Sequence, residues 1–550
     1  MPMRNPQPKT GKKRFLTGVL LLFSATFLAK LIGLFYKVPL IRIVGVEGMA
    51  YFLAAYHIYS LLFVLSATGL PNALSLLVAR AEARGAPAAA RQCFRVAAAL
   101  FLLLGTMGTA VLIFFATPLA ERLSMRESAA AIMAVAPSLF LAGWIGAVRG
   151  YFQGRHNMMP TAVSEVLEAV GKLAFGLFFS LLAAKNGAEP PMLAAAAILG
   201  ITAGMCLSAL FLLVWYLADR LRRWGEQGAG DVTLRQQRIL PRLMRLALPM
   251  TLSASVMSLV SLVDTALISG RLQAAGFAPS VANSLYSAYG NLAVPLYNLV
   301  PSLLSPLSLA LMPMMGSALA KEDQKGACGL LLSGVRLTAL ISLPAALGLS
   351  AFATPILSMI YRGESDAVAV AAPLLSLLAV AVVPACFIAL SGAALQAMGH
   401  PGVPVAAMGA GALAKLMAEF FLLTVPAVGI YAAPVSTLLC NVVVLGVQLA
   451  VLCRVFPFRV SPARDLFRPL LAALFSVGAG LCLYAGAARR LSPTPRLLIA
   501  LPFTVCLYVF LSLRFGALTR EDLGAVPFGE KICPALEKLR LFPRPAQNKE

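Results

Sequence analysis

Long apolar runs follow one another along almost the whole chain, and short polar or Gly/Pro-rich segments separate them. Each run reaches the length of about 20 residues that a helix needs to cross a bilayer. The pattern predicts about fourteen membrane helices, over 15–40, 48–78, 91–117, 129–153, 159–184, 192–217, 242–268, 284–316, 327–352, 367–397, 402–424, 428–453, 466–487 and 493–513. We therefore expect an all-α polytopic membrane protein.

The composition supports a bilayer as the solvent of this chain. Hydrophobic residues make up 60% and charged residues 12% of the 550 positions, whereas soluble domains carry about 25% charged residues. The nine cysteines are scattered and no CxxC pair occurs. The sequence therefore predicts neither a disulfide framework nor a metal site.

The positive charges indicate how the helices are oriented. The net charge is +23, and Lys and Arg cluster in the breaks between apolar runs. With the N-terminus inside, the predicted inside segments hold 31 of the 45 Lys+Arg and the outside segments hold 9. Cytoplasmic segments of membrane proteins carry such an excess. We expect both termini in the cytoplasm, and this placement of charge disfavours binding to nucleic acid.

The chain also contains an internal repeat. The segment Phe115–Leu119 recurs 237 residues later as Phe352–Ile356. Shorter matches at similar offsets are Ala55-Tyr56 with Ala288-Tyr289, Ala136–Leu141 with Ala372–Leu377, Gln153 with Gln396, and Lys172-Leu173 with Lys415-Leu416. The repeat pairs the first six helices with the next six, and an even number per unit makes the two halves parallel.

The repeat and the breaks divide the chain into six regions. They are a basic cytoplasmic N-terminus (1–14), a six-helix lobe (15–217), a cytoplasmic linker (218–241), a second six-helix lobe (242–453), two further membrane helices (466–513) and a cytoplasmic tail (514–550). Transporters built from such repeats bind substrate between the halves. We therefore expect transport by alternating access.

A short set of charged side chains falls within the predicted helices. They are Lys30 and Lys37 in the first, Glu165, Glu168 and Lys172 in the fifth, Asp264 in the seventh, Arg336 in the ninth, and Lys415 and Glu419 in the eleventh, and Arg42 lies near the outer end of the first. A charge at mid-membrane costs a few kcal/mol, so such residues usually face a cavity or a partner. The spacing places Lys30 and Lys37 on one helix face.

Two interpretations of these charges are open. Residues 168 and 172, like 415 and 419, either line a cavity or only neutralise each other along one helix. Arg336 either faces a cavity or reaches the cytoplasmic interface with its long side chain. Lys30 has no acid within a helical turn, which favours a cavity function. Asp264, Glu165 and Glu168 are candidates for a titrating or cation-binding role.

Three segments resemble a known family. Lys30-Leu31-Ile32-Gly33 resembles the first span of the polysaccharide-export and MurJ-type flippases. Residues 67–75, ATGLPNALS, resemble the end of the second span in the stage V sporulation protein B branch. Arg149–Gly154, followed by Met159–Ala162, resembles the junction between the fourth and fifth spans of that branch, with Arg149, Gln153 and Gly154 as its characteristic residues.

The resemblance implies a lipid-linked oligosaccharide flippase of the bacterial plasma membrane. Its implied cargo is lipid II, the undecaprenyl-pyrophosphate precursor of peptidoglycan, used in cell-wall or spore-cortex synthesis. Such flippases place basic first-span residues in a central cavity, where they meet the pyrophosphate. Lys30 matches this position, and Tyr36 stands where a second basic residue is expected. Lys37 and Arg42 are therefore the candidates for further anion contacts, and the last two helices for a lipid-tail groove.

The expected partners follow from the same resemblance. We expect no enzyme activity and no cofactor, since flipping needs no covalent chemistry and no GxxxxGK[ST] motif occurs. Energy would come from a coupling cation, Na⁺ or H⁺, or from the membrane potential. The expected partners are the bilayer and a lipid II-like oligosaccharide lipid, bound by a monomeric transporter. Cell-wall synthesis proteins are candidate associates.

Two other functions compete with this one. The flippases that the chain resembles belong to the multidrug/oligosaccharidyl-lipid/polysaccharide (MOP) flippase superfamily. An ion-coupled multidrug or organic-cation antiporter of that superfamily should line its cavity with carboxylates and aromatic rings. A non-transporting scaffold for cell-wall enzymes would have little need of charges inside the membrane. The lysines of the first span disfavour both.

Overall fold

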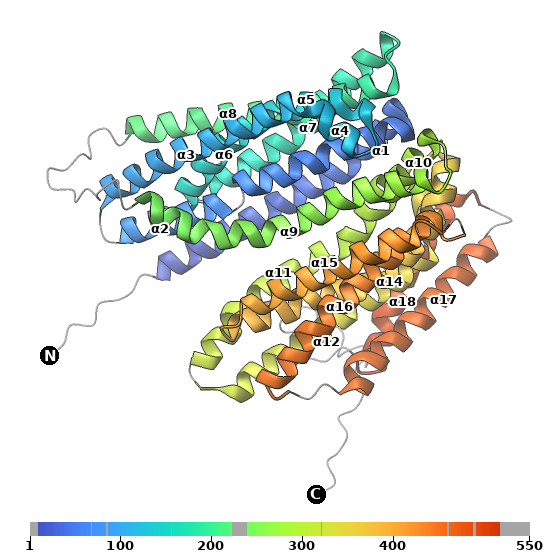
Figure 1. Cartoon of the computed structure of the whole chain (residues 1–550). Coiled ribbons are helices and arrows are strands. Elements are labelled where there is room, and N and C mark those ends of the chain that lie inside the picture. The colour runs from blue at the N-terminus through green and yellow to red at the C-terminus, as the bar shows by residue number, and fades with distance from the viewer. Residues whose placement is uncertain are drawn as a thin grey trace, which may run out of the picture. The chain divides into compact units, whose positions relative to one another are not determined.

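The computed structural model describes residues 9–67, 69–83, 86–155, 157–222, 239–320, 322–425, 427–458, 461–487 and 491–517. Every regular element within these residues is a helix, which confirms the predicted all-α fold (Figure 1). The chain forms two compact units, Met1–Ser287 and Ala288–Glu550. The lobe boundary expected between 217 and 242 stays a prediction.

The first unit contains long helices with short ones between them. They are α1 (Lys9–Ala67), α2 (Gly69–Ala83), α3 (Pro87–Phe114), α4 (Ala116–Arg122), η1 (Arg126–Ser128), α5 (Ala129–Val135), α6 (Pro137–Gly154), α7 (Met159–Lys185), α8 (Pro190–Arg222), α9 (Ile239–Ala274) and α10 (Pro279–Ser287). The helix α6 packs against α3 and α8, and α7 packs closely against α8 (Figure 1).

The second unit is also built of long helices with short ones between them. Its elements are η4 (Ala288–Ala293), α11 (Val294–Ala320), α12 (Gln324–Ala351), α13 (Ala353–Ile360), α14 (Ser365–Ala397), α15 (Gly402–Leu422), η5 (Gly429–Tyr431), α16 (Ala432–Val455), η6 (Ala463–Phe467), α17 (Arg468–Gly486) and α18 (Pro493–Arg514). By length and composition, ten helical segments of the described residues are able to cross a membrane. The number fourteen stays a prediction.

A single glycine separates the first two predicted membrane helices. Helical backbone continues on both sides of Gly45, which itself has φ 77° and ψ 162°. Residues with a Cβ are almost never found there, so a glycine is required. The sequence predicted a break between residues 40 and 48, and the structure reduces it to this one position.

The internal repeat has a structural counterpart in each unit. Phe115 stands at the bend between α3 and α4, with φ −108° and ψ 14°. Phe352, its repeat partner, stands at the bend between α12 and α13, with φ −102° and ψ 18°. The matched segment therefore bends the third helix of each half in the same way.

The two family-like segments of the first unit pack against each other. Gly150 and Gly154 of α6 are four residues apart and face α2. A Cβ on Gly150 would lie 2.7 Å from the carbonyl oxygen of Pro71, and one on Gly154 would lie 2.5 Å from that of Ser75. Small residues at this spacing let membrane helices approach at backbone distance. Residues 71–75 and 150–154 of the two segments thus form one helix contact.

One arginine joins three helix ends of the same unit. Arg155 follows α6 directly, and its side chain is 7% exposed. Its Nε lies 3.1 Å from Oε1 of Glu82 on α2, and its Nη1 lies 2.8 Å from Oδ2 of Asp219 on α8. This arginine therefore holds α2, α6 and α8 together at one end of the unit.

A buried ion pair attaches the C-terminal helices to the rest of the second unit. Arg336 of α12 is 7% exposed and Asp465 of η6 is 1% exposed. Their Nε and Oδ1 atoms are 3.1 Å apart. Asp465 also accepts from the backbone N–H of Ser461 at 3.0 Å and from Arg464 at 3.2 Å. Arg336 thus contacts the start of the predicted thirteenth span.

We expect Gly154→Ala to destabilise the protein by about 1–3 kcal/mol, because the new methyl group overpacks the contact with α2. The measurement is the thermal unfolding midpoint in detergent. Gly348→Ala is the matched control, since a Cβ on that helical glycine meets nothing within 4 Å. Equal midpoints for the two variants would contradict the backbone contact.

We expect Arg336→Met to cost about 3 kcal/mol, the lower end of the range for breaking a buried pair, because Arg464 still neutralises part of Asp465. The double variant Arg336→Met/Asp465→Leu should recover most of this loss, since no buried charge is left alone. Chemical unfolding of both variants tests the pair. A double variant no more stable than the single one would rule it out.

Candidate functional site

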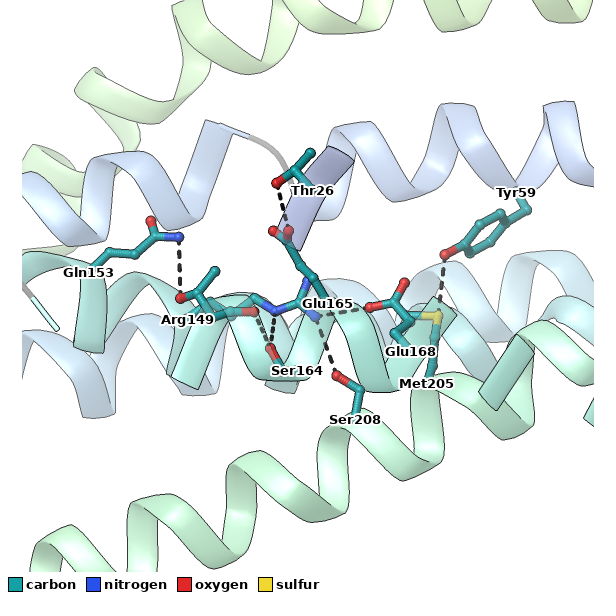
Figure 2. Close-up of polar contacts among 10 residues, drawn as sticks. Thr26, Tyr59, Arg149, Gln153, Ser164, Glu165, Glu168, Met205 and Ser208 are labelled. Carbon is teal, nitrogen blue, oxygen red and sulfur yellow. Dashed lines mark hydrogen bonds and ion pairs between the residues drawn. The ribbon is translucent and has the colours of Figure 1, made fainter. Parts of the chain in front are cut away.

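The polar centre of the first unit is built around Arg149 on α6 (Figure 2). Its Nε donates to Oγ of Ser164 at 2.8 Å. Its Nη2 lies 3.0 Å from Oε2 of Glu168 and 3.3 Å from Oγ of Ser208. One guanidinium therefore links α6 to α7 and α8, and it uses the fixed fork of donors that arginine offers.

The second carboxylate of α7 has a different partner. Glu165 accepts a hydrogen bond from Thr26 of α1 at 2.8 Å (Figure 2). Gln153 of α6 donates to the hydroxyl of Thr161 on α7 at 3.4 Å. The two acids of α7 thus point to separate helices, and residues from α1, α6, α7 and α8 converge on this region.

Lys172 of α7 lies close to the part of α1 that carries Lys37. The Nζ atom of Lys172 lies 5.8 Å from the ring centre of Tyr36 and 5.2 Å from that of Tyr56. A cation over an aromatic face is stabilised without losing its charge. The structure therefore brings together two of the predicted basic residues.

Tyr36 is buried at the position where the family resemblance expects a second basic residue. Its side chain is 1% exposed and its hydroxyl donates to the carbonyl of Ala197 on α8 at 3.0 Å. Lys172 supplies a positive charge above the same ring. Lys172 of α7 therefore supplies a positive charge beside Tyr36, at the position where the first span lacks the expected basic residue.

Glycines determine how close α7 and α8 lie. A Cβ on Gly200 would lie 2.3 Å from the Cα of Gly176, and one on Gly204 would lie 2.7 Å from the carbonyl oxygen of Glu168. The two helices are therefore in backbone contact beside the residues of the site. This contact fixes the position along α8 at which the side chains of Glu168 and Lys172 lie.

The charged pair of the eleventh predicted span lies in the second unit. Nζ of Lys415 is 3.7 Å from Oε1 of Glu419, and both belong to α15. Glu419 is 0% exposed and also accepts from Ser436 of α16 at 2.8 Å. In α7, by contrast, the ion pair of Glu168 within the described residues runs to Arg149 on α6 and not to Lys172.

The remaining predicted residues lie apart from this cluster. Arg42 is exposed on α1, three residues before Gly45. Asp264 is half-buried on α9, next to Thr265, whose hydroxyl lies 2.7 Å from Nδ1 of His57. The backbone of Lys30 belongs to α1, but its side chain lies outside the described residues. Arg336 forms the ion pair with Asp465.

The sequence did not single out Ser164, Ser208 and Tyr56. Ser164 stands four residues before Glu168, on the same helix face, so its spacing carried a signal. Ser208 and Tyr56 belong to other helices, and only the tertiary structure brings them to Arg149 and Lys172.

A polar pocket beside the Gly45 bend was also not predicted. It has a volume of about 530 Å³, and its lining includes Glu47, Tyr51 and Glu127. The hydroxyl of Tyr51 donates to Glu47 at 3.1 Å and also to Glu127. These acids lie in the short junctions between predicted spans, where sequence patterns give little information.

Comparison with known proteins places this chain in a family. A family model described as polysaccharide biosynthesis protein matches residues 15–319, and one described as MatE matches 249–421. Stage V sporulation protein B of Bacillus subtilis (strain 168) is 27% identical over 454 residues, which are 82% of this chain and 86% of that protein. Lipid II flippase MurJ of the same organism is 28% identical over 181 residues, 31% of this chain and 33% of that protein.

A solved structure supports the fold in addition. Lipid II flippase MurJ in its inward closed conformation has a TM-score of 0.67 at 15% sequence identity, with 90% of this chain and 98% of that chain covered. Such a likeness shows the architecture alone. Because the polysaccharide biosynthesis model spans more than half of the chain and the apolar helices agree with it, this multi-pass membrane protein belongs to the polysaccharide biosynthesis protein family of the MOP flippase superfamily.

Proposed function

We propose that this protein moves a lipid-linked saccharide with a pyrophosphate headgroup, most specifically lipid II, across the bacterial plasma membrane by alternating access. The observation that carries the proposal is the position of Lys172, whose Nζ lies 5.8 Å from the ring centre of Tyr36, the residue before Lys37 on α1. A cation inside the membrane is stabilised by an anion that binds beside it. A pyrophosphate supplies such an anion and has enough charge to interact with a second basic residue as well.

The surrounding network supports an anion as the ligand. Arg149 neutralises Glu168, which is the acid one turn from Lys172 on the same helix. Glu165 is turned toward Thr26 of α1. The positive charge of Lys172 is therefore available to a ligand, and its position over the rings of Tyr36 and Tyr56 keeps it in place.

The physics of moving a pyrophosphate headgroup across a bilayer also supports the proposal. A pyrophosphate must cross about 30 Å of hydrocarbon, and charge-assisted hydrogen bonds from lysines replace the water it loses. Lys30 is proposed as a further contact of the headgroup. The polyprenyl tail stays in the lipid beside α17 and α18, which expose large apolar side chains such as Phe475 and Leu498.

The proposal also includes a driving force for transport and a location in the cell. Na⁺ or H⁺ binding at Glu165 or Asp264, or the membrane potential acting on the bound charges, would drive the cycle. Both termini are proposed to lie in the cytoplasm, with the protein acting as a monomer near cell-wall synthesis proteins. The relatives named for spore formation and for lipid II flipping support a role in wall or cortex synthesis.

We expect Lys172→Gln and Lys37→Gln each to reduce flipping of labelled lipid II in proteoliposomes by about 10- to 100-fold, the effect of losing one hydrogen bond to a charged group. Lys172→Arg should retain most of the activity. Lys185→Gln is the control, since that lysine is exposed at the end of the same helix. The liposomes also contain an organic cation, and transport of the cation alone would favour the multidrug antiporter.

We expect Lys30→Ala to abolish complementation in cells depleted of their lipid II flippase, because the first cationic contact of the headgroup is lost, whereas Lys30→Arg should complement. Western blotting and size-exclusion chromatography show whether the variants reach the membrane folded. Full rescue by Lys30→Ala would contradict the assignment. Rescue by neither variant nor the native chain, with all three folded, would favour a scaffold.

A further inference from the structure

An apolar groove opens on the surface of the first unit, and its lining does not include Lys37, Lys172 or Arg149. Its volume is about 360 Å³, within the range of about 300–1,000 Å³ found for small-ligand sites. It is lined by Leu102 of α3, Phe140, Leu141 and Trp144 of α6, and Cys206, Ala209, Leu210 and Leu213 of α8. The helix α6 packs against both α3 and α8, so its side chains lie between the two walls of the groove.

Each wall of the groove leads along one helix face to an arginine. On α8, the exposed residues Cys206, Leu210, Leu213, Leu217 and Arg220 follow one another at helical spacing. On α3, Arg95 is exposed and precedes Leu102 by two turns. Both walls therefore change from apolar to positively charged.

Aromatic contacts show that the two arginines lie at the same end of the groove. The ring of Phe94, the residue before Arg95, is 4.9 Å from that of Tyr216, one turn before Arg220. It is also 5.0 Å from the ring of Tyr151 on α6. Tyrosine and tryptophan gather at the level of lipid headgroups. This end of the groove therefore has the chemistry of a membrane interface.

Among the described residues, the acids near these arginines are bound by another side chain. Glu82 and Asp219, the acids of α2 and α8 at this end, are both bound by Arg155. Within the described part of the chain, neither Arg95 nor Arg220 forms an ion pair. The mouth of an apolar groove thus carries a net positive charge.

We propose that this groove binds a phospholipid with an anionic headgroup, with its phosphate at Arg95 and Arg220 and an acyl chain along α6. The charge complementarity commits the site to an anionic lipid, because a zwitterionic lipid would fill the groove equally well but would gain less from two arginines. Basic pockets between membrane helices bind anionic headgroups in this way. The site is separate from the proposed cargo site and does not depend on the identity of the cargo.

Trp144 in the groove provides the test. In the variant Trp215→Phe/Trp224→Phe it is the one tryptophan left, so quenching by phospholipids brominated on their acyl chains reports occupancy of the groove. Brominated phosphatidylglycerol should reach half-maximal quenching at about 10- to 30-fold lower mole fraction than brominated phosphatidylcholine, as expected for two basic side chains at the headgroup level. Equal quenching by the two lipids would overturn the proposal.

Charge variants assign the effect to the groove. Arg95→Gln/Arg220→Gln should abolish the preference, whereas Arg222→Gln should retain it, because Arg222 is exposed at the same helix end but on another face. A preference kept by the double variant would also overturn the proposal. Native mass spectrometry of the chain with all its tryptophans repeats the comparison, with retained phosphatidylglycerol as the readout, should the double tryptophan variant fail to fold.

Discussion

Backbone groups inside a bilayer have no water to bond, and each one left unsatisfied costs several kcal/mol. This cost makes every membrane-spanning segment a helix and leaves the contacts between helices to decide the structure. In the first unit these contacts are made at backbone distance. Gly150 and Gly154 bring α6 to α2, and Gly200 and Gly204 bring α8 to α7. Gly150 and Gly154 belong to the segment that resembles the stage V sporulation protein B branch, and their role in this structure is helix packing.

The bilayer also determines how the charged side chains are arranged. Glu168, Glu419 and Asp465 are each within reach of a cation. Glu419 also accepts a hydrogen bond from Ser436, and Asp465 accepts one from the backbone of Ser461. Such pairs hold helices in register, and they leave few charges for a ligand. The lysine of α7 stands out against this background, because its nearest acid along the helix is bound by Arg149.

Much of this architecture could be predicted from the sequence, because it rests on local patterns. Apolar run lengths predicted the helices, the Gly45 break was placed within a few residues, and the FATP repeat marked the bends at Phe115 and Phe352. Partners across helices could not be predicted. Spacing along α7 showed that Glu168 and Lys172 share a face, but only tertiary packing decides that Arg149 takes the carboxylate. The groove beside Trp144 was missed for the same reason.

The repeat has one consequence for how the two halves differ. Lys172 and Lys415 occupy the same position in the two copies of the repeat. In the second copy the lysine is 7% exposed and tied to Glu419 on its own helix, whereas in the first it lies over the rings of Tyr36 and Tyr56. The two copies therefore share helices and bends but differ in their electrostatics. One half presents the lysine to aromatic faces, and the other uses the same residue in an ion pair of its framework.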